Sequence, residues 1–329
     1  MNETHTMQNS ENISKKSNFL SVNELMKSEF TPPGWIWNGL IPDKGLTFFC
    51  GRPGTKKSLI MQALILHIVS GKSFLDHETK KCSVIILDSE NTLSELATRF
   101  QTLDAKINTE SESCNAFIWL DSEVTLTPIG LKDLHTKIKE LNPELIVFDS
   151  FIRFFQNLDE NSSKDVRIVF QSLRPILKER AVLILHHAIK GKGRVDSQSL
   201  RGSGDLFASA SSTLVINEGP NGLVEITQEK NRQGSFEKSM KIITKQEEIE
   251  GKKSTEFIRV NDDRISQTAE ILVTKWIDDN VDENSTFKSG EVYNNLTQFS
   301  QTELRETLSI LLNKGKITYV SKGKWLRLS

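Results

Sequence analysis

The segment from Gly51 to Ser58 carries the clearest chemical signal in the sequence. It reads Gly-Arg-Pro-Gly-Thr-Lys-Lys-Ser, after an apolar run at residues 46–50 and before a helical apolar pattern at residues 59–66. A glycine-rich turn between a strand and a helix, ending in Lys-Ser, is the layout of a nucleotide phosphate loop, whose usual form is G-x-x-x-x-G-K-[ST]. The segment therefore predicts a phosphate-binding site at the start of a helix.

Each part of this loop has a predicted task. Backbone N–H groups can point inward and cradle phosphate oxygens, and the following helix adds partial positive charge at its N-terminus. Lys57 is expected to reach the β- and γ-phosphates, and Ser58 to ligate Mg²⁺. The residues predicted to bind ATP are Gly51, Arg52, Pro53, Gly54, Thr55, Lys56, Lys57, Ser58 and Leu59.

Lys56 stands where the usual form of the loop has its last glycine. The replacement has two interpretations: a variant that keeps the fold of the loop, or a degenerate site that binds nucleotide weakly. A third possibility is a simple glycine turn between a strand and a helix. Lys57 and Ser58 argue against this third possibility, because Lys-Ser at the start of a helix has no packing purpose.

Two later strand ends supply carboxylates. Residues 145–148 are apolar and lead to Asp149, the pattern of a Walker B strand about 90 residues after the loop, so Asp149 is expected to hold Mg²⁺ directly or through water. Residues 84–87 lead to Asp88 and Glu90. Glu90 is predicted to polarise the attacking water, with Asp88 as the rival base that we expect to support the site. The alternative for Glu90 is a solvated acid in a turn.

Two adjacent histidines follow the apolar residues 182–185. Because side chains alternate along a strand, His186 and His187 are expected to point to opposite faces, which argues against a shared metal ion. His187 lies at the tip of the strand and is predicted to sense the γ-phosphate through a hydrogen bond. The alternative is that one histidine packs in the core and the other is merely exposed.

The loop of residues 190–201 is basic and rich in glycine. It contains Lys190, Lys192, Arg194 and Arg201. Such a loop is flexible and can contact the phosphates of single-stranded DNA without reading its sequence. A solvated basic loop with no partner fits the same residues.

A second basic pair, Lys230 and Arg232, lies at the turn of residues 231–234. An exposed Lys-x-Arg tip could reach the γ-phosphate bound by a neighbouring subunit, as an arginine finger does. This prediction requires self-association, and the alternative is an ordinary surface turn.

Size and composition indicate a globular protein with no membrane partner. The chain has 329 residues, enough for one large domain and a small one, and its net charge of −1 leaves DNA binding to local patches. No apolar run approaches the roughly 20 residues of a membrane span. Cys50, Cys82 and Cys114 lack metal spacing, so we expect reduced thiols in a cytoplasmic protein. Residues 1–20 are polar and are predicted to form a disordered tail.

The apolar runs predict an α/β fold for residues 21–262. Strand-like runs alternate with segments long enough for crossover helices, which is typical of a largely parallel sheet that binds ligands at the carboxyl ends of its strands. These runs are residues 46–50, 83–87, 116–120, 145–149, 182–186 and 213–216. Three antiparallel strands are then predicted at residues 223–228, 240–245 and 256–260, with turns at 231–234 and 251–254.

A second unit is predicted at residues 263–329. Helices at 268–277, 289–296 and from the capping box at 300–303 through 313, followed by a hairpin of residues 316–320 and 325–328, indicate a winged helix-turn-helix. Its third helix carries acids beside its one arginine, which does not favour tight DNA binding, so a protein partner is a serious alternative.

With these parts in this order, the chain resembles RecA-fold ATPases over roughly residues 30 to 245, most closely the plasmid RepA-like and DnaB-like hexameric helicases. The motifs that carry the resemblance are the lead-in at residues 35–45, the phosphate loop, the Asp-x-Glu strand end at 88–90, the Walker B segment at 149–154, the histidine strand with the loop beyond it at 186–203, and the basic turn at 230–234. Lys56 and the C-terminal unit depart from the family pattern.

The resemblance implies an ATP-driven motor on DNA, assembled as a ring or filament, with ATP and Mg²⁺ between subunits. It implies that Glu90 is the catalytic base and that Arg232 acts on the neighbouring subunit's nucleotide. A different class of function is also open, in which ATP switches the assembly of a DNA-bound regulator or recombination accessory protein that does not unwind DNA.

Overall fold

A computed structural model describes most of the chain. The described residues are 21–27, 34–107, 109, 115–120, 124–154, 159, 161–188, 195–196, 207–219, 223–234, 239–249, 251–260, 262–296, 299 and 301–328. The predicted tail at residues 1–20 and Cys114 lie outside them, as does the basic loop of residues 190–201 apart from Val195 and Asp196. The chain divides into two compact units, Met1–Gly34, which contains the short helix α2 (Val22–Lys27), and Trp35–Ser329.

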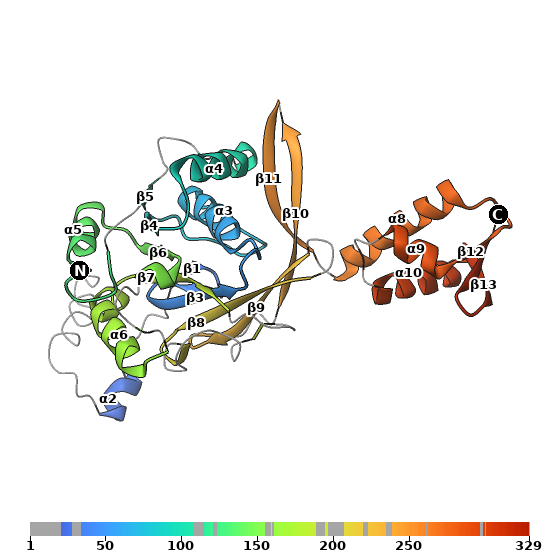
Figure 1. Ribbon diagram of the computed structural model, residues 1–329. Helices are drawn as coiled ribbons and strands as arrows, with labels where there is room; N and C mark the ends of the chain where they lie inside the picture. Colours follow the sequence, from blue (N-terminus) through green and yellow to red (C-terminus); the bar gives the residue numbers. More distant parts are fainter. Residues whose placement is uncertain are drawn as a thin grey trace, which may run out of the picture. The chain divides into compact units, whose positions relative to one another are not determined.

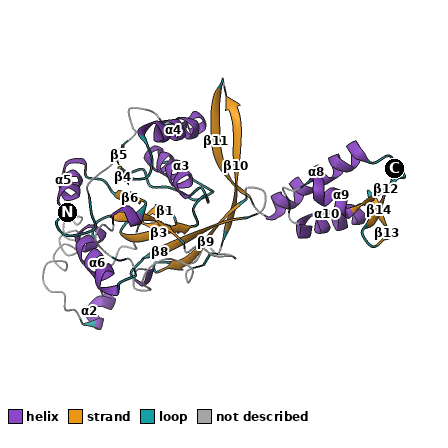
Figure 2. Ribbon diagram, in the orientation of Figure 1, coloured by secondary structure: helices purple, strands orange, loops and turns teal. Residues whose placement is uncertain are grey.

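The second unit contains a nine-stranded sheet in the order β11-β10-β9-β8-β3-β7-β6-β4-β5 (Figures 1 and 2). Six strands are parallel: β3 (Gly45–Gly51), β4 (Val84–Asp88), β5 (Ala116–Leu120), β6 (Leu145–Asp149), β7 (Ala181–His187) and β8 (Ser212–Glu218). Three are antiparallel: β9 (Val224–Asn231), β10 (Met240–Ile249) and β11 (Lys252–Val260). The predicted α/β class with a largely parallel sheet is confirmed.

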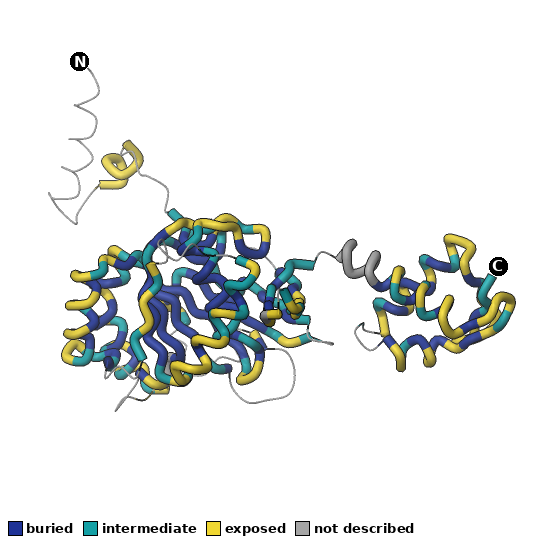
Figure 3. Tube along the Cα trace, turned by 90° about the horizontal axis from the view of Figure 1, so that it is seen from above, coloured by how far each residue is buried: buried dark blue, intermediate teal, exposed yellow. Residues whose placement is uncertain are grey.

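Helices cover both faces of this sheet, as the alternation of the buried strands requires. On β6, Leu145 and Val147 belong to one hydrophobic cluster and Ile146 and Phe148 to another. The first cluster includes residues of α3 (Lys57–Ser70) and α4 (Leu93–Ile107), and the second includes residues of α5 (Lys132–Leu141) and α6 (Ser163–Leu177). Figure 3 shows these central strands as the buried part of the sheet. Burial on both faces explains why the parallel strands read as continuous apolar runs.

Short or polar strands are where the structure differs from the sequence prediction. β11 begins at Lys252 rather than at residue 256, because the outer arms of the β10–β11 hairpin are polar and give no apolar signal. The hairpin of β1 (Trp35–Trp37) and β2 (Ile41–Pro42) was not predicted. It is anchored by Trp37, which is fully buried and whose indole N–H donates to the Phe74 carbonyl at 3.1 Å.

The C-terminal residues form a small helical unit with its own hydrophobic cluster. Its elements are α8 (Asp262–Asn280), β12 (Thr286–Lys288), α9 (Ser289–Asn295), α10 (Gln301–Asn313), β13 (Ile317–Ser321) and β14 (Lys324–Arg327). The three strands form an antiparallel sheet in the order β12-β14-β13, and β12 was not predicted. Buried residues of all three helices, such as Val273, Val292 and Leu308, pack together. The winged-helix interpretation and the domain boundaries at residues 21, 262 and 263 stay predictions.

Candidate functional site

Four predicted site elements lie at one edge of the sheet. Gly51, His187, Asp149 and Asp88 end the neighbouring strands β3, β7, β6 and β4. The register places Gly51 beside His187 and Asp88 beside Asp149. Because these strands are parallel, their carboxyl ends form the edge where ligands bind in open α/β sheets.

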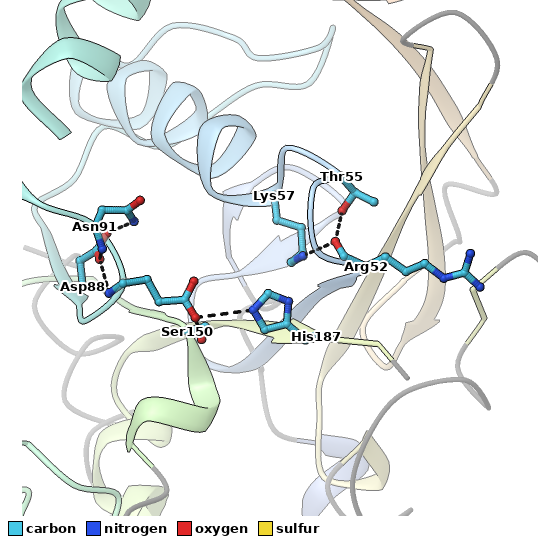
Figure 4. A network of polar contacts seen from close by, with 8 residues as sticks. Arg52, Thr55, Lys57, Asp88, Asn91, Ser150 and His187 are labelled. Atoms are coloured by element: carbon cyan, nitrogen blue, oxygen red, sulfur yellow. Dashed lines mark hydrogen bonds and ion pairs between the residues drawn. The ribbon is translucent and has the colours of Figure 1, made fainter. Parts of the chain in front are cut away.

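The phosphate loop leaves β3 in a turn that needs glycine. A Cβ atom on Gly51 would lie 2.8 Å from the Ile216 carbonyl oxygen, and Gly54 has a φ of 87°. Three donors meet on one carbonyl oxygen, that of Arg52: the Thr55 hydroxyl at 2.8 Å, the Thr55 N–H at 3.3 Å and the Lys57 ammonium at 2.7 Å (Figure 4). The loop is therefore closed on itself directly before α3 begins.

Lys56 precedes α3 in the left-handed conformation, with φ 61° and ψ 18°. Glycine adopts this conformation without strain, whereas a residue with a Cβ atom is held there at a cost of about 1 kcal/mol or more. The chain thus makes a turn that suits glycine with a lysine in it. The Lys56 ammonium donates to the Thr244 hydroxyl on β10 at 3.0 Å.

Lys57 is the first residue of α3 and is only 6% exposed. Burial lowers its pKa from 10.5 to about 8, and the nearby Asp149 carboxylate opposes this change. A buried ammonium at the start of a helix is well placed to meet the negative oxygens of a phosphate chain.

Asp149 is almost fully buried, and its side chain accepts a hydrogen bond from Ser58. Burial, with the charge of Asp88 next, raises its pKa from 3.8 to about 7. Its Oδ2 atom is buried and has no hydrogen-bond partner in the part of the chain that the structure describes. An orphaned carboxylate oxygen beside a serine hydroxyl suits Mg²⁺, which binds hard oxygen donors. The described residues contain no group of three or more His, Cys, Asp or Glu side chains placed for a metal ion, so the ion would share its ligands with the substrate phosphates.

Replacing Asp149 by asparagine should stabilise the nucleotide-free protein at alkaline pH. The pKa of Asp149 is raised on folding, so between about pH 4 and 7 the unfolded chain loses this proton first and wild-type stability falls as the pH rises. Asp88 and Glu90 reinforce the raised pKa and Lys57 opposes it, and Asp149→Asn removes the titration. Urea unfolding should show the variant gaining up to a few kcal/mol over the wild type between pH 5 and 8. Equal pH dependence in both proteins would contradict the raised pKa.

The turn after β4 is organised by Asp88, which is fully buried. Its Oδ1 atom accepts the backbone N–H groups of Glu90 at 3.0 Å and of Asn91 at 2.9 Å, and its Oδ2 atom accepts the Asn91 amide at 2.8 Å (Figure 4). With both oxygens committed to the turn, Asp88 holds Glu90 in place, in agreement with its predicted supporting role.

Glu90 is held between Ser150 and His187. The Ser150 hydroxyl donates to Glu90 Oε1, and His187 Nε2 lies 3.6 Å from the same oxygen. The His187 imidazole, followed by the Ser150 hydroxyl, lowers the pKa of Glu90 from 4.5 to about 2, against the raising effect of burial. Glu90 is therefore a carboxylate at neutral pH, about one-third exposed at the open edge of the sheet.

The two histidines separate as strand alternation predicts. His186 is buried, and its ring centroid lies 6.1 Å from that of Phe48 and 5.6 Å from that of Phe207. His187 is 28% exposed and faces Glu90. Its Nδ1 atom is buried with no hydrogen-bond partner among the described residues, so this nitrogen is available to a further group.

Comparison with known proteins decides the family. A family model described as an AAA domain (AAA_25) matches residues 12–193, more than half of the chain. The chain belongs to this AAA-domain family. It is a P-loop ATPase with a RecA-like fold, as the resemblance in the sequence indicated, and membership implies nucleotide binding.

A solved structure supports the fold of this ATPase. The ATPase domain of a DnaB-like helicase matches with a TM-score of 0.50 at 13% identity, over 73% of this chain and 96% of that one. A KaiC-like protein, PH0186 from Pyrococcus horikoshii OT3, matches with a TM-score of 0.47 at 14% identity, over 68% of this chain and 96% of that one. The identities are low, so the likeness to the helicase domain shows the fold alone. No curated protein matches at a significant level. None of the helices described for the ATPase is both long and apolar enough to span a membrane.

Arg232 is not part of the site formed by its own subunit. It follows β9, whose last residue, Asn231, pairs with Ser212 at the start of β8, whereas Gly51 lies beside Ile216 near the end of that strand. Four residues of strand, about 13 Å, separate these levels. Arg232 thus lies toward the opposite edge of the sheet from the phosphate loop, and the ATPase can use it on a nucleotide only across a subunit interface.

In its own subunit, Arg232 is tied to a neighbouring turn. Its guanidinium donates to the Ala208 carbonyl, and Lys230 donates to the carbonyls of Phe207 at 2.8 Å and Ala208 at 2.6 Å. Arg232 also lines a surface pocket of about 510 Å³ together with Arg167 of α6. The described residues that line this pocket include no acid, which makes it suited to an anion.

Sequence reasoning missed three residues that the structure connects to the site. Ser150 directly follows Asp149, so its position next to the Walker B carboxylate was a usable signal. Arg167 lies on an exposed face of α6, and Thr244 lies on an antiparallel strand far along the chain. Neither of these two carries a local pattern, because their contacts depend on how the strands and helices pack.

Proposed function

We propose that this ATPase hydrolyses ATP with Mg²⁺ and uses the energy to move on single-stranded DNA, as a RepA-like helicase assembled in a ring or filament. The observation that carries the proposal is the convergence of Lys57, Ser58, Asp149, Glu90 and His187 at the carboxyl edge of one sheet. Each of these residue types has a task in phosphoryl transfer, which depends on positioning and on stabilising negative charge.

The binding tasks follow from burial and charge. The N–H groups of the phosphate loop and the buried ammonium of Lys57 would hold the β- and γ-phosphates. Ser58 and Asp149 would hold Mg²⁺, which when bound neutralises charge on the phosphate oxygens. The loop and the start of α3 orient the phosphate chain toward the edge where Glu90 and His187 lie.

Glu90 is assigned the task of orienting the attacking water. A carboxylate with a pKa of about 2 is a poor proton acceptor near pH 7, but it accepts hydrogen bonds from water well. Ser150 and His187 hold this carboxylate at the edge of the sheet. His187 can in turn report the presence of a γ-phosphate to Glu90, because the two side chains are in contact.

A link from this site to the predicted DNA loop supports the motor. Within the 190–201 loop, the backbone N–H and carbonyl of Val195 are both bonded to the Asn217 side chain at the end of β8, at 2.7 and 2.9 Å. Val195 also lines a pocket of about 600 Å³ with Arg52 and Thr55 of the phosphate loop. A change in the phosphate loop on hydrolysis would therefore reach the middle of the basic loop directly.

The test is strand displacement by the wild type and by Glu90→Gln. The wild type should separate a duplex with a single-stranded tail only when ATP is supplied. Glu90→Gln keeps the shape of the side chain but cannot orient water through a carboxylate, so turnover and displacement should fall about 100-fold or more while ATP still binds. Full activity in Glu90→Gln would contradict the assignment of Glu90.

The second candidate is an ATP-switched regulator that does not unwind DNA, and the C-terminal unit favours it. On β13, the side chains of Tyr319 and Val320 are 54% and 48% exposed, and Glu303 and Glu306 accompany Arg305 on α10. Exposed apolar residues and mixed charge suit a protein partner, whereas Lys322 and Lys324 in the following turn could contact DNA phosphates. ATP-dependent oligomerisation without strand displacement would favour this candidate.

A further inference from the structure

The lysine that replaces glycine in the phosphate loop has one polar partner among the described residues. The Lys56 ammonium donates to the hydroxyl of Thr244, 188 residues away on β10, at 3.0 Å. Lys56 is the residue before α3, so the contact joins the end of the phosphate loop to the β10–β11 hairpin. Glycine at this position could not make it.

Thr244 occupies a firmly placed part of that hairpin. In the register of β10 with β11 it stands opposite Phe257, which is buried in the cluster that includes α3. Further along the hairpin, Lys106 near the end of α4 forms ion pairs with Glu247 of β10 at 3.3 Å and with Glu256 of β11. The hairpin is therefore tied to the start of α3 on one side and to the end of α4 on the other.

Helix α4 is in turn tied to the turn that carries Glu90. The Arg99 guanidinium of α4 donates to the Asn91 side chain at 2.8 Å, and Asn91 is bonded to Asp88. A continuous set of polar contacts thus runs from Lys56 through the hairpin and α4 to the Glu90 turn.

These polar ties matter because the hairpin does not fill the space against the helices. A pocket of about 450 Å³ lies between α3, α4 and β11, lined by His67, Leu103 and Phe257 among others. Where packing is incomplete, the distance between elements is set by the contacts that remain at the margins of the gap.

We propose that Lys56 is a positioning residue that fixes the phosphate loop relative to Glu90 by tethering it to Thr244 of the hairpin. The proposal rests on the assignment of Glu90 and the phosphate loop to ATP hydrolysis. It makes the lysine a structural substitute within the motif: Lys57 binds phosphate, while Lys56 uses its ammonium on β10. The expected consequence is that Lys56 affects kcat more than KM for ATP.

Amide hydrogen exchange in the nucleotide-free protein tests the tether apart from catalysis. Lys56→Met and Thr244→Val each remove one partner while keeping the size of the side chain. Each should raise the exchange rate of amides 52–59 roughly fivefold, the effect of losing one hydrogen bond. The double variant should exchange no faster than either single one, because both remove the same contact. Lys56→Arg, which keeps a donor, should exchange close to the wild type.

Lys80→Met is the matched control, since Lys80 forms a surface ion pair with Glu144 and should leave amides 52–59 unchanged. In ATPase assays, Lys56→Met and Thr244→Val should both lower kcat several-fold with little change in KM. Weakened ATP binding in Lys56→Met but not in Thr244→Val would overturn the proposal and make Lys56 a phosphate ligand. Unchanged exchange in both variants would also overturn it. If the wild type hydrolysed no ATP, the proposed function would fail, and the exchange result would still decide the tether.

Discussion

Replacing Lys57 by alanine should abolish ATP turnover while leaving the fold intact. The Lys57 ammonium is buried at the start of α3, next to Asp149, where a phosphate chain would receive its charge. Removing one preorganised positive group from a phosphoryl-transfer site costs at least about 100-fold in kcat. The measurement is steady-state phosphate release at saturating ATP, alongside thermal unfolding to show that the variant is folded.

The fold is expected to survive because Lys57 is a costly residue to bury. Its lowered pKa shows that the ammonium is desolvated, so alanine removes a burial cost together with the contact to the Arg52 carbonyl. Lys80→Ala on the surface serves as the control with one lysine fewer and a normal turnover. Turnover equal to the wild type in Lys57→Ala would refute the whole site assignment.

The sheet could be predicted because each of its parallel strands is buried on both faces. Runs such as residues 145–148 carry four apolar side chains in a row, and only one polar residue, Asp149, follows at the strand end. The same feature located the site, since parallel strands bring all their carboxyl ends to one edge. The separate tasks of His186 and His187 followed from strand alternation alone.

Contacts between distant residues could not be predicted. The left-handed conformation of Lys56 is invisible in the sequence, where a lysine suggests only charge. Its bond to Thr244 depends on the packing of a hairpin whose outer arms are polar and unpatterned. Likewise, nothing in the sequence placed Arg232 beside the Ala208 carbonyl and away from the phosphate loop. Packing decides such contacts, and local patterns do not record it.

Of the two interpretations of Lys56, the structure favours the variant that keeps the fold of the loop. The backbone at Lys56 makes the turn that suits glycine, Lys57 begins α3, and the Arg52 carbonyl closes the loop. A degenerate loop would be expected to lose the buried lysine or the serine that contacts Asp149, and both are present.

Replacing Arg232 by alanine should reduce ATP turnover about 1,000-fold or more, the usual effect of losing an arginine finger. The residue lies toward the opposite edge of the sheet from its own phosphate loop, so the loss would occur at the neighbouring subunit's nucleotide. The turn that Arg232 contacts should stay in place, because Lys230 donates to two carbonyls of the same turn. Phosphate release and thermal unfolding of the variant are the two measurements.

Mixing two inactive variants separates action across an interface from action within one subunit. Each active interface needs an intact Lys57 on one side and an intact Arg232 on the other. Random mixing of Lys57→Ala with Arg232→Ala supplies both at about a quarter of the interfaces, so about a quarter of wild-type turnover should return. If Arg232 acted within its own subunit, no mixed assembly would contain a complete site, and the mixture would stay as inactive as its parts.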